Sequence, residues 1–85
     1  MSFYVYMLKS ISSAKPRTYV GYTNNVKLRL EKHNTNKGAK STRGYKWVVI
    51  YKKMFKDKSK AMSFEYSLKK NRIKRLSILK DNLNE

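Results

Sequence analysis

Three short apolar runs along the chain predict three strands. Residues 3–8 are continuously apolar and rich in aromatic and β-branched side chains, which is typical of a central strand packed on both faces. Residues 10–16 have the composition of a turn and residues 18–22 form a second run, so the two runs predict a hairpin. Gly21 lies near the end of the second strand, where a missing side chain lets another backbone approach closely. The third run predicts a strand over 47–55.

Three helices are predicted from apolar side chains that recur three or four residues apart. The first begins near Val26, and its apolar stripe continues through Leu30 and His33. The second covers 60–70 and the third covers 72–83. The residues able to cap these helices are Thr23, Asn24 or Asn25 before the first and Asp57 or Ser59 before the second.

The remaining segments complete a small α+β fold. Residues 34–46 have no apolar periodicity and predict an exposed loop, and residues 82–85 are expected to fray. The element order β-β-α-β-α-α predicts a small three-stranded antiparallel sheet flanked by helices. With 85 residues and no repeat or linker, the chain is expected to form a single domain over residues 1–85.

The charge of the chain indicates a polyanionic partner. The 21 Lys and Arg residues outnumber the 5 Asp and Glu residues, which gives a formal net charge of +16. Each nucleic-acid phosphate that a Lys or Arg neutralises releases condensed counterions, and this drives binding of any sequence. Solubility alone needs only a few charges on a small domain. An anionic membrane surface is the other polyanion available, but the charge favours nucleic acid.

Other features of composition exclude several classes of protein. The chain has no Cys, so it can form neither a disulfide framework nor a thiolate zinc site. Its first residues lack the charged and apolar regions of a signal peptide, and no apolar run approaches the length of a membrane span. We therefore expect a soluble cytoplasmic protein.

Glu65 stands in the apolar stripe of the second predicted helix. It follows Ala61 by four residues and precedes Leu68 by three, which places it on the core-facing side. A carboxylate in that place is costly unless it is paired or bound to a cation. The sequence leaves open whether its partner is one of the many Lys and Arg side chains or a metal ion.

Arg29 and His33 share one face of the first predicted helix. They are four residues apart, and His33 is the only His in the chain. His33 could be a half-buried helix residue without a chemical role, and Arg29 could be solvated. Together with Glu65, however, they offer a guanidinium, an imidazole and a carboxylate, a set that suits phosphoryl transfer.

The tyrosines of the predicted strands are further candidates. Tyr4 and Tyr6 share one face of the first strand, and Tyr19 can join them from its neighbour. Most strand tyrosines serve as core aromatics. A Tyr that moves protons near neutral pH would need its pKa lowered from about 10, which requires roughly 4 kcal/mol of differential stabilisation.

The ordered set of these residues resembles the GIY-YIG nuclease superfamily, in its small single-domain bacterial (YhbQ-like) type. The resemblance covers residues 3–70. Tyr4-Val5-Tyr6 stands where the family has Gly-Ile-Tyr, and Tyr19-Val20-Gly21 stands at the second tripeptide. The remaining matches are Arg29, His33-Asn34, the Lys-Gly-Ala-Lys-Ser-Thr-Arg-Gly loop over 37–44, and Glu65.

The resemblance implies catalytic roles and one divalent ion, Mg²⁺ or Mn²⁺. By analogy, Tyr6 is the general base or its relay to the attacking water, and Tyr19 positions the nucleophile or the phosphate. Arg29 stabilises charge on the reacting phosphorus, His33 is a proton relay or alternative base, and Glu65 holds the metal. Many members also carry an Asn after the metal-binding Glu; here Asn71 and Asn82 follow it by six and seventeen residues.

Binding would then rely on the basic surface of the domain itself, with residues 72–83 forming a basic C-terminal helix. No base-reading element is evident, so we expect contacts to the backbone and a preference for shape. A protein partner could supply specificity, and the sequence does not indicate an oligomeric state. The candidate nucleic-acid-binding residues are Lys37, Lys40, Arg43, Lys46, Lys69, Lys70, Arg72, Lys74 and Arg75.

The sequence therefore predicts a metal-dependent endonuclease that acts on flapped, branched or single-stranded DNA. DNA is favoured over RNA as the substrate. The expected role is in repair or recombination, in the bacterial cytosol or nucleoid. The alternative is a non-catalytic DNA- or RNA-binding module of the same fold. A further option is a ribosome- or RNA-associated basic protein that binds through residues 72–85.

Overall fold

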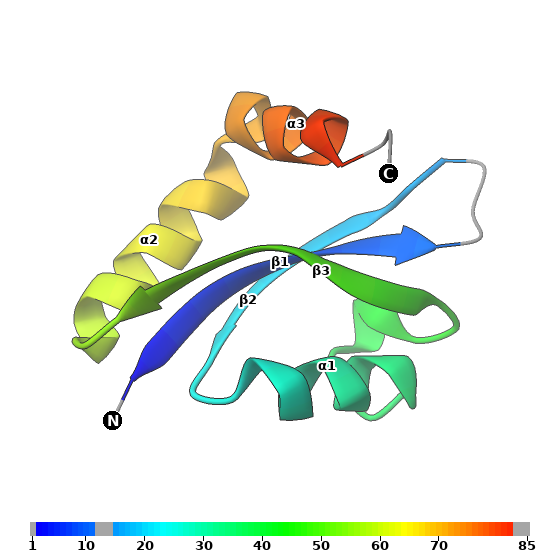
Figure 1. Cartoon of the computed structure of the whole chain (residues 1–85), viewed down its shortest axis with the longest axis horizontal. Helices are drawn as coiled ribbons and strands as arrows, with labels where there is room; N and C mark the ends of the chain where they lie inside the picture. The colour runs from blue at the N-terminus through cyan, green and yellow to red at the C-terminus, as the bar shows by residue number, and fades with distance from the viewer. Residues whose placement is uncertain (1, 12–14, 83–85) are drawn as a thin grey trace.

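The computed structural model describes residues 2–11 and 15–82, and it confirms an α+β fold with one three-stranded sheet. The order of elements is the one predicted, with one short 3₁₀ helix added (Figure 1). The strands are β1 (Phe3–Ile11), β2 (Thr18–Thr23) and β3 (Lys46–Phe55), and the helices are α1 (Val26–Asn34), the 3₁₀ helix η1 (Lys40–Thr42), α2 (Lys58–Lys70) and α3 (Arg72–Asp81).

β1 is the central strand, as its continuous apolar run predicted. The sheet order is β2-β1-β3, and both pairings are antiparallel. In the register with β2, Tyr6 lies opposite Gly21 and Leu8 lies opposite Tyr19. The pairing with β3 contains an irregularity between Met7 and Leu8. Consecutive side chains over residues 5–8 are all buried, so β1 is covered on both faces of the sheet as well as paired at both edges.

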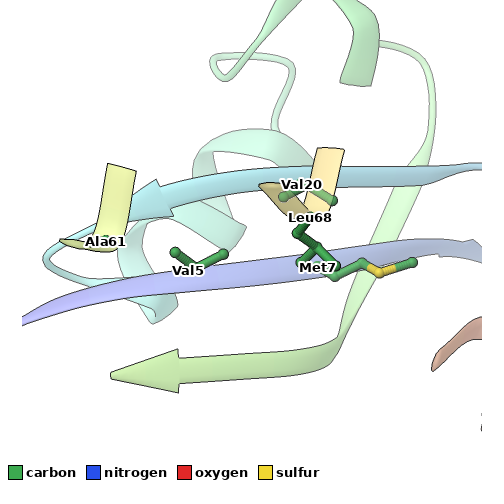
Figure 2. Close-up of a cluster of buried hydrophobic side chains, with 5 residues drawn as sticks. All are labelled: Val5, Met7, Val20, Ala61 and Leu68. Atoms are coloured by element: carbon green, nitrogen blue, oxygen red, sulfur yellow. The ribbon is translucent and has the colours of Figure 1, made fainter. Parts of the chain in front are cut away.

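Alternation along β1 builds a separate core on each face of the sheet. Val5 and Met7 pack with Val20 against α2, through Ala61 and Leu68 (Figure 2). α2 and α3 lie on this side of the sheet, and α1 lies on the other (Figure 1).

The second core lies on the α1 side. Tyr6 and Leu8 pack there with Trp47. Val26 and Leu30 of α1 are among the partly buried side chains around them. The sheet thus separates an aliphatic core under α2 from an aromatic core under α1.

Local hydrogen bonds fix where each α-helix begins. Asn25 caps α1, because its side-chain oxygen accepts from the backbone N–H of Leu28 at 3.0 Å. Asp57 caps α2 in the same way, through Ser59 at 2.8 Å. Asn71 both ends α2 and caps α3.

The structure extends some predicted elements. β1 continues to Ile11 instead of turning at residue 10, because Ser10 pairs with Arg17 through its backbone N–H and its hydroxyl oxygen. α2 begins at Lys58, directly after its Asp57 cap. α3 ends at Asp81; Leu83, which the prediction included, lies outside the described residues.

The prediction of an exposed loop over 34–46 is wrong in part. Asn34 belongs to α1, and Lys40–Thr42 form η1. Thr42 is fully buried and accepts through its backbone carbonyl the indole N–H of Trp47, at 2.9 Å. A segment without apolar periodicity is thus held by polar contacts. No helix in the described part of the chain combines the length and the apolar character needed to span a membrane.

Replacing Ala61 by Leu should lower the free energy of unfolding by about 1–3 kcal/mol, because Ala61 is fully buried between α2 and the sheet and a larger side chain would overpack that contact. The neighbouring Met62 is 47% exposed, so Met62→Leu should change stability by less than about 0.5 kcal/mol. Urea unfolding followed by circular dichroism measures both. Equal effects would contradict this packing.

Candidate active site

Tyr6 reaches the site because a glycine faces it across the sheet. Gly21 is its partner on β2, and a Cβ added there would lie 2.6 Å from the Tyr6 hydroxyl and 3.0 Å from the Tyr19 ring. No real Cβ comes so close to another heavy atom. Gly21 therefore provides the space in which the Tyr6 phenol lies.

Three rings from β1, β2 and α1 meet at this place. The ring centroid of Tyr19 lies 6.3 Å from that of Tyr6 and 4.9 Å from that of His33. The Tyr6 and His33 centroids are 6.0 Å apart. The structure thus brings together two strand tyrosines and a helix histidine that are far apart in the sequence.

His33 is a buried polar residue with a hydrogen-bond partner on each side. Its side chain is fully buried. Nε2 lies 2.9 Å from the Tyr6 hydroxyl oxygen, and Nδ1 lies 2.9 Å from Oγ1 of Thr42. The reading of His33 as a half-buried residue is therefore wrong, because the imidazole is enclosed and both of its nitrogens are engaged.

Arg29 lies one helical turn before His33 and interacts with both tyrosines. Hydrogen bonding to Tyr6 is the main cause that raises the pKa of Arg29, with a smaller contribution from Tyr19. The Tyr6 oxygen therefore has His33 on one side and a cation on another. Arg29 is partly exposed, so its guanidinium can also meet a bound anion.

Burial dominates the electrostatics of Tyr6. Desolvation raises its pKa to about 12, although the hydrogen bond from Arg29 acts in the opposite direction. The Glu65 carboxylate adds a small further rise, so Glu65 acts on Tyr6 from α2. Tyr6 is thus a neutral phenol at neutral pH. The lowered pKa that a free phenolate base would need is absent from this structure.

Burial also acts on His33. Desolvation lowers its pKa below the ordinary value, and the positive charge of Arg29 lowers it further. The imidazole is therefore neutral at neutral pH, which suits a proton acceptor.

Glu65 lies on α2 and has a basic partner. Its side chain is 18% exposed and its Oε1 lies 3.3 Å from Nζ of Lys69. This is the pairing that the sequence left open beside metal binding. No group of three or more His, Cys, Asp or Glu side chains able to hold a metal occurs among the described residues. A single partly exposed carboxylate still fits Mg²⁺, which keeps several waters and binds through one or two carboxylates and substrate phosphates.

A second set of contacts, missed by sequence reasoning, anchors the segment behind His33. The Asn34 side chain accepts from the Trp47 backbone N–H at 2.6 Å and donates to the Trp47 carbonyl at 3.1 Å. A Cβ on Gly38 would collide with the His33 ring. Gly38 and Thr42 both lie in the loop motif of the resemblance, which was the only sequence signal for them.

Several of the candidate nucleic-acid-binding residues also have partners within the chain. The Lys46 ammonium donates to the Asn34 carbonyl at 2.9 Å. Arg75 donates to the Leu68 carbonyl at 3.0 Å and to that of Lys69, so it satisfies the end of α2. Lys69 pairs with Glu65. The remaining six members of the set are exposed, and they are Lys37, Lys40, Arg43, Lys70, Arg72 and Lys74.

The two asparagines after Glu65 serve the helices. The Asn71 side chain accepts from the Lys74 backbone N–H at 3.0 Å, and the Asn82 side chain donates to the Ile78 carbonyl at 2.8 Å. Neither contact involves a residue of the ring cluster.

Comparisons with known proteins bear on the family and the fold of this chain. Residues 2–76 match the family described as the GIY-YIG catalytic domain. A UPF0213 protein of Oceanobacillus iheyensis is 48% identical over 67 residues, which cover 78% of this chain and 74% of the relative. A UPF0213 protein of Staphylococcus haemolyticus is 45% identical over 67 residues, covering 78% of each chain. The solution NMR structure of a UPF0213 protein from Bacillus halodurans is similar to this fold with a TM-score of 0.52 and 34% identity, over 96% of this chain and 86% of that one.

The folded protein should become less stable as the pH falls from 6.5 toward 5. His33 is neutral when folded, whereas the unfolded imidazole takes up a proton below its ordinary pKa of about 6.5, so acid favours the unfolded state. The slope should approach about 1.4 kcal/mol per pH unit at most. Urea unfolding at several pH values measures it, and His33→Gln should flatten the curve in this window, where carboxyls ordinarily titrate little. A flat wild-type curve would contradict the neutral buried imidazole.

Proposed function

Because the chain belongs to the GIY-YIG catalytic domain family, we propose that it is a metal-dependent endonuclease that hydrolyses phosphodiester bonds in DNA. The observation that carries the proposal is the buried hydrogen bond between Tyr6 and His33, with Arg29 beside the same phenol oxygen. A proton donor, a neutral acceptor and a fixed cation are the groups that water attack on a phosphodiester requires.

The partly exposed residues of the site would meet the substrate. Tyr19, Arg29 and Glu65 are partly exposed, whereas Tyr6 and His33 are buried. Arg29 would bind a nonbridging phosphate oxygen and stabilise the negative charge that grows there in the transition state. Tyr19 would orient the phosphate or the attacking water.

The buried pair would carry the proton of the attacking water. Burial raises the pKa of the Tyr6 phenol to about 12 and lowers the pKa of the His33 imidazole, so full proton transfer between them is unfavourable in the resting site. A free Tyr6 phenolate would therefore hardly accumulate. Tyr6 acts as a relay: its oxygen receives the water proton while its own proton passes to Nε2 of His33 as the water attacks.

Glu65 would hold one Mg²⁺ or Mn²⁺ ion. When bound, such an ion polarises the phosphate and assists departure of the leaving oxygen. The carboxylate would exchange its contact with Lys69 for the ion, and Lys69 would then be free to approach a phosphate. A single carboxylate makes weak metal binding without substrate the expected behaviour.

The basic surface would hold the backbone of the substrate over this site. The net charge of +16 supports binding that depends on phosphates and falls steeply with salt. We propose flapped, branched or single-stranded DNA as the substrate class, in repair or recombination within the cytoplasm. A protein partner could add specificity.

Glu65→Gln should lower cleavage by about 10²-fold or more while DNA binding is retained, because the charge that holds the ion is lost and the basic surface is unchanged. Glu31→Gln is the matched control. Glu31 is an exposed acid on α1, so the Glu31→Gln protein should cleave DNA as wild type does. The assay uses a panel of flapped, branched and single-stranded DNA and RNA with Mg²⁺ or Mn²⁺, and gel-shift measurements report binding. If wild type cuts nothing while binding persists, the chain is a non-catalytic binding module.

The pH dependence of cleavage separates a Tyr6 relay from a Tyr6 phenolate. The relay needs only a neutral His33, so kcat should be nearly flat between pH 6.5 and 9 at saturating metal ion. A phenolate base with a pKa of about 12 would instead give a tenfold rise per pH unit over the same range. Single-turnover cleavage rates provide the measurement, and such a rise would overturn the relay.

A further inference from the structure

The hydrogen bonds of Thr42 determine its role toward His33. Oγ1 of Thr42 lies 2.7 Å from the backbone carbonyl of Ala39, and a carbonyl can only accept. The single hydroxyl hydrogen of Thr42 is therefore directed at Ala39. Toward Nδ1 of His33, 2.9 Å away, Oγ1 can act only as an acceptor. Nδ1 must then carry a hydrogen.

The same reasoning continues across the ring. A neutral imidazole has one N–H, so Nε2 of His33 holds a lone pair and accepts. Its partner is the Tyr6 hydroxyl at 2.9 Å, which must donate. A chain of three hydrogen bonds therefore runs in one direction, from Tyr6 to His33, from His33 to Thr42, and from Thr42 to Ala39.

We propose that Thr42 is a positioning residue that holds His33 as the Nδ1–H tautomer and thereby directs the Tyr6 proton toward Nε2. The hydrogen bond made by one ring nitrogen fixes the state of the other. Without this contact the Nε2–H tautomer, which a free imidazole side chain prefers in water, would leave Tyr6 no acceptor. The effect on cleavage rests on the proposed function, but the tautomer itself does not.

The surroundings of Thr42 support a dedicated role. Thr42 is fully buried, although it lies in a segment that is otherwise mostly exposed. Its backbone carbonyl receives the indole N–H of Trp47 at 2.9 Å. Gly38, in the same segment, has no side chain at the place where a Cβ would collide with the His33 ring. The segment is therefore shaped to bring one hydroxyl to Nδ1.

The tautomer can be observed directly because His33 is the only His in the chain. Two-bond ¹H–¹⁵N correlation spectra of the ¹⁵N-labelled protein at pH 7.5 give one imidazole pattern. We expect a protonated, pyrrole-type shift at Nδ1 and an unprotonated, pyridine-type shift at Nε2. The reverse pattern in the wild-type protein would overturn the proposal without any variant.

Three variants locate the cause of the tautomer. Thr42→Ser keeps the hydroxyl and should keep the wild-type pattern, whereas Thr42→Val removes it and should move the proton to Nε2. Tyr6→Phe should keep the Nδ1–H pattern, because the proposal assigns control to Thr42. A Thr42→Val protein that retains Nδ1–H, or a Tyr6→Phe protein that loses it, would overturn the proposal.

Cleavage supplies a separate readout. Thr42→Val should lower kcat by about 10²–10⁴-fold with little change in KM, and Thr42→Ser should restore most of it. Wild-type kcat in a Thr42→Val protein with the altered tautomer would overturn the positioning role. Absence of cleavage in the wild type would instead refute the proposed function, and the spectra would still decide the tautomer.

Discussion

The buried hydrogen bond between Tyr6 and His33 is the interaction on which the rest of the site depends. It joins the central strand to α1 inside the aromatic core, where an unpartnered polar group would be costly. No buried side-chain polar atom in the described part of the chain lacks a partner. Two neighbouring features meet this need. Gly21 makes room for the Tyr6 phenol, and Thr42 in η1, which we call the turn behind His33, provides a hydrogen-bond partner for Nδ1 of His33. Tyr6 and His33, which are proposed for chemistry, are therefore also buried structural residues, and a substitution at either should change stability as well as activity.

Much of the fold could be predicted because its signals are local. The continuous apolar run of β1 reflects burial on both faces, and the i, i+4 spacing of Arg29 and His33 reflects the α1 face that meets the strand tyrosines. Glu65 stood out because an acid interrupts an apolar stripe. The sequence pointed to Tyr6, Tyr19, Arg29 and His33, and these lie together although they come from three separate elements.

The rest depends on contacts that leave no periodic signal. The Thr42 hydroxyl is hydrogen-bonded to the carbonyl of Ala39 and to the imidazole of His33. It lies inside a segment whose sequence predicts an exposed loop. The direction of the Tyr6 pKa is a similar case. A nearby cation such as Arg29 predicts a lowered pKa for Tyr6. In the structure, burial outweighs the effect of Arg29 and raises that pKa, and the extent of burial is known only from the assembled fold. A count of charges cannot tell which basic side chains are available to a ligand. Lys46 and Arg75, for example, donate hydrogen bonds to backbone carbonyls of the protein itself.

The position of Trp47 gives this protein an intrinsic optical probe. It is the only tryptophan in the chain and is 3% exposed, and its indole N–H is bonded to the carbonyl of Thr42. Any loosening of the turn behind His33 would change the polarity around that indole. The emission spectrum of the unlabelled protein would then report how well the turn is formed, with no fluorophore added to a surface meant for nucleic acid.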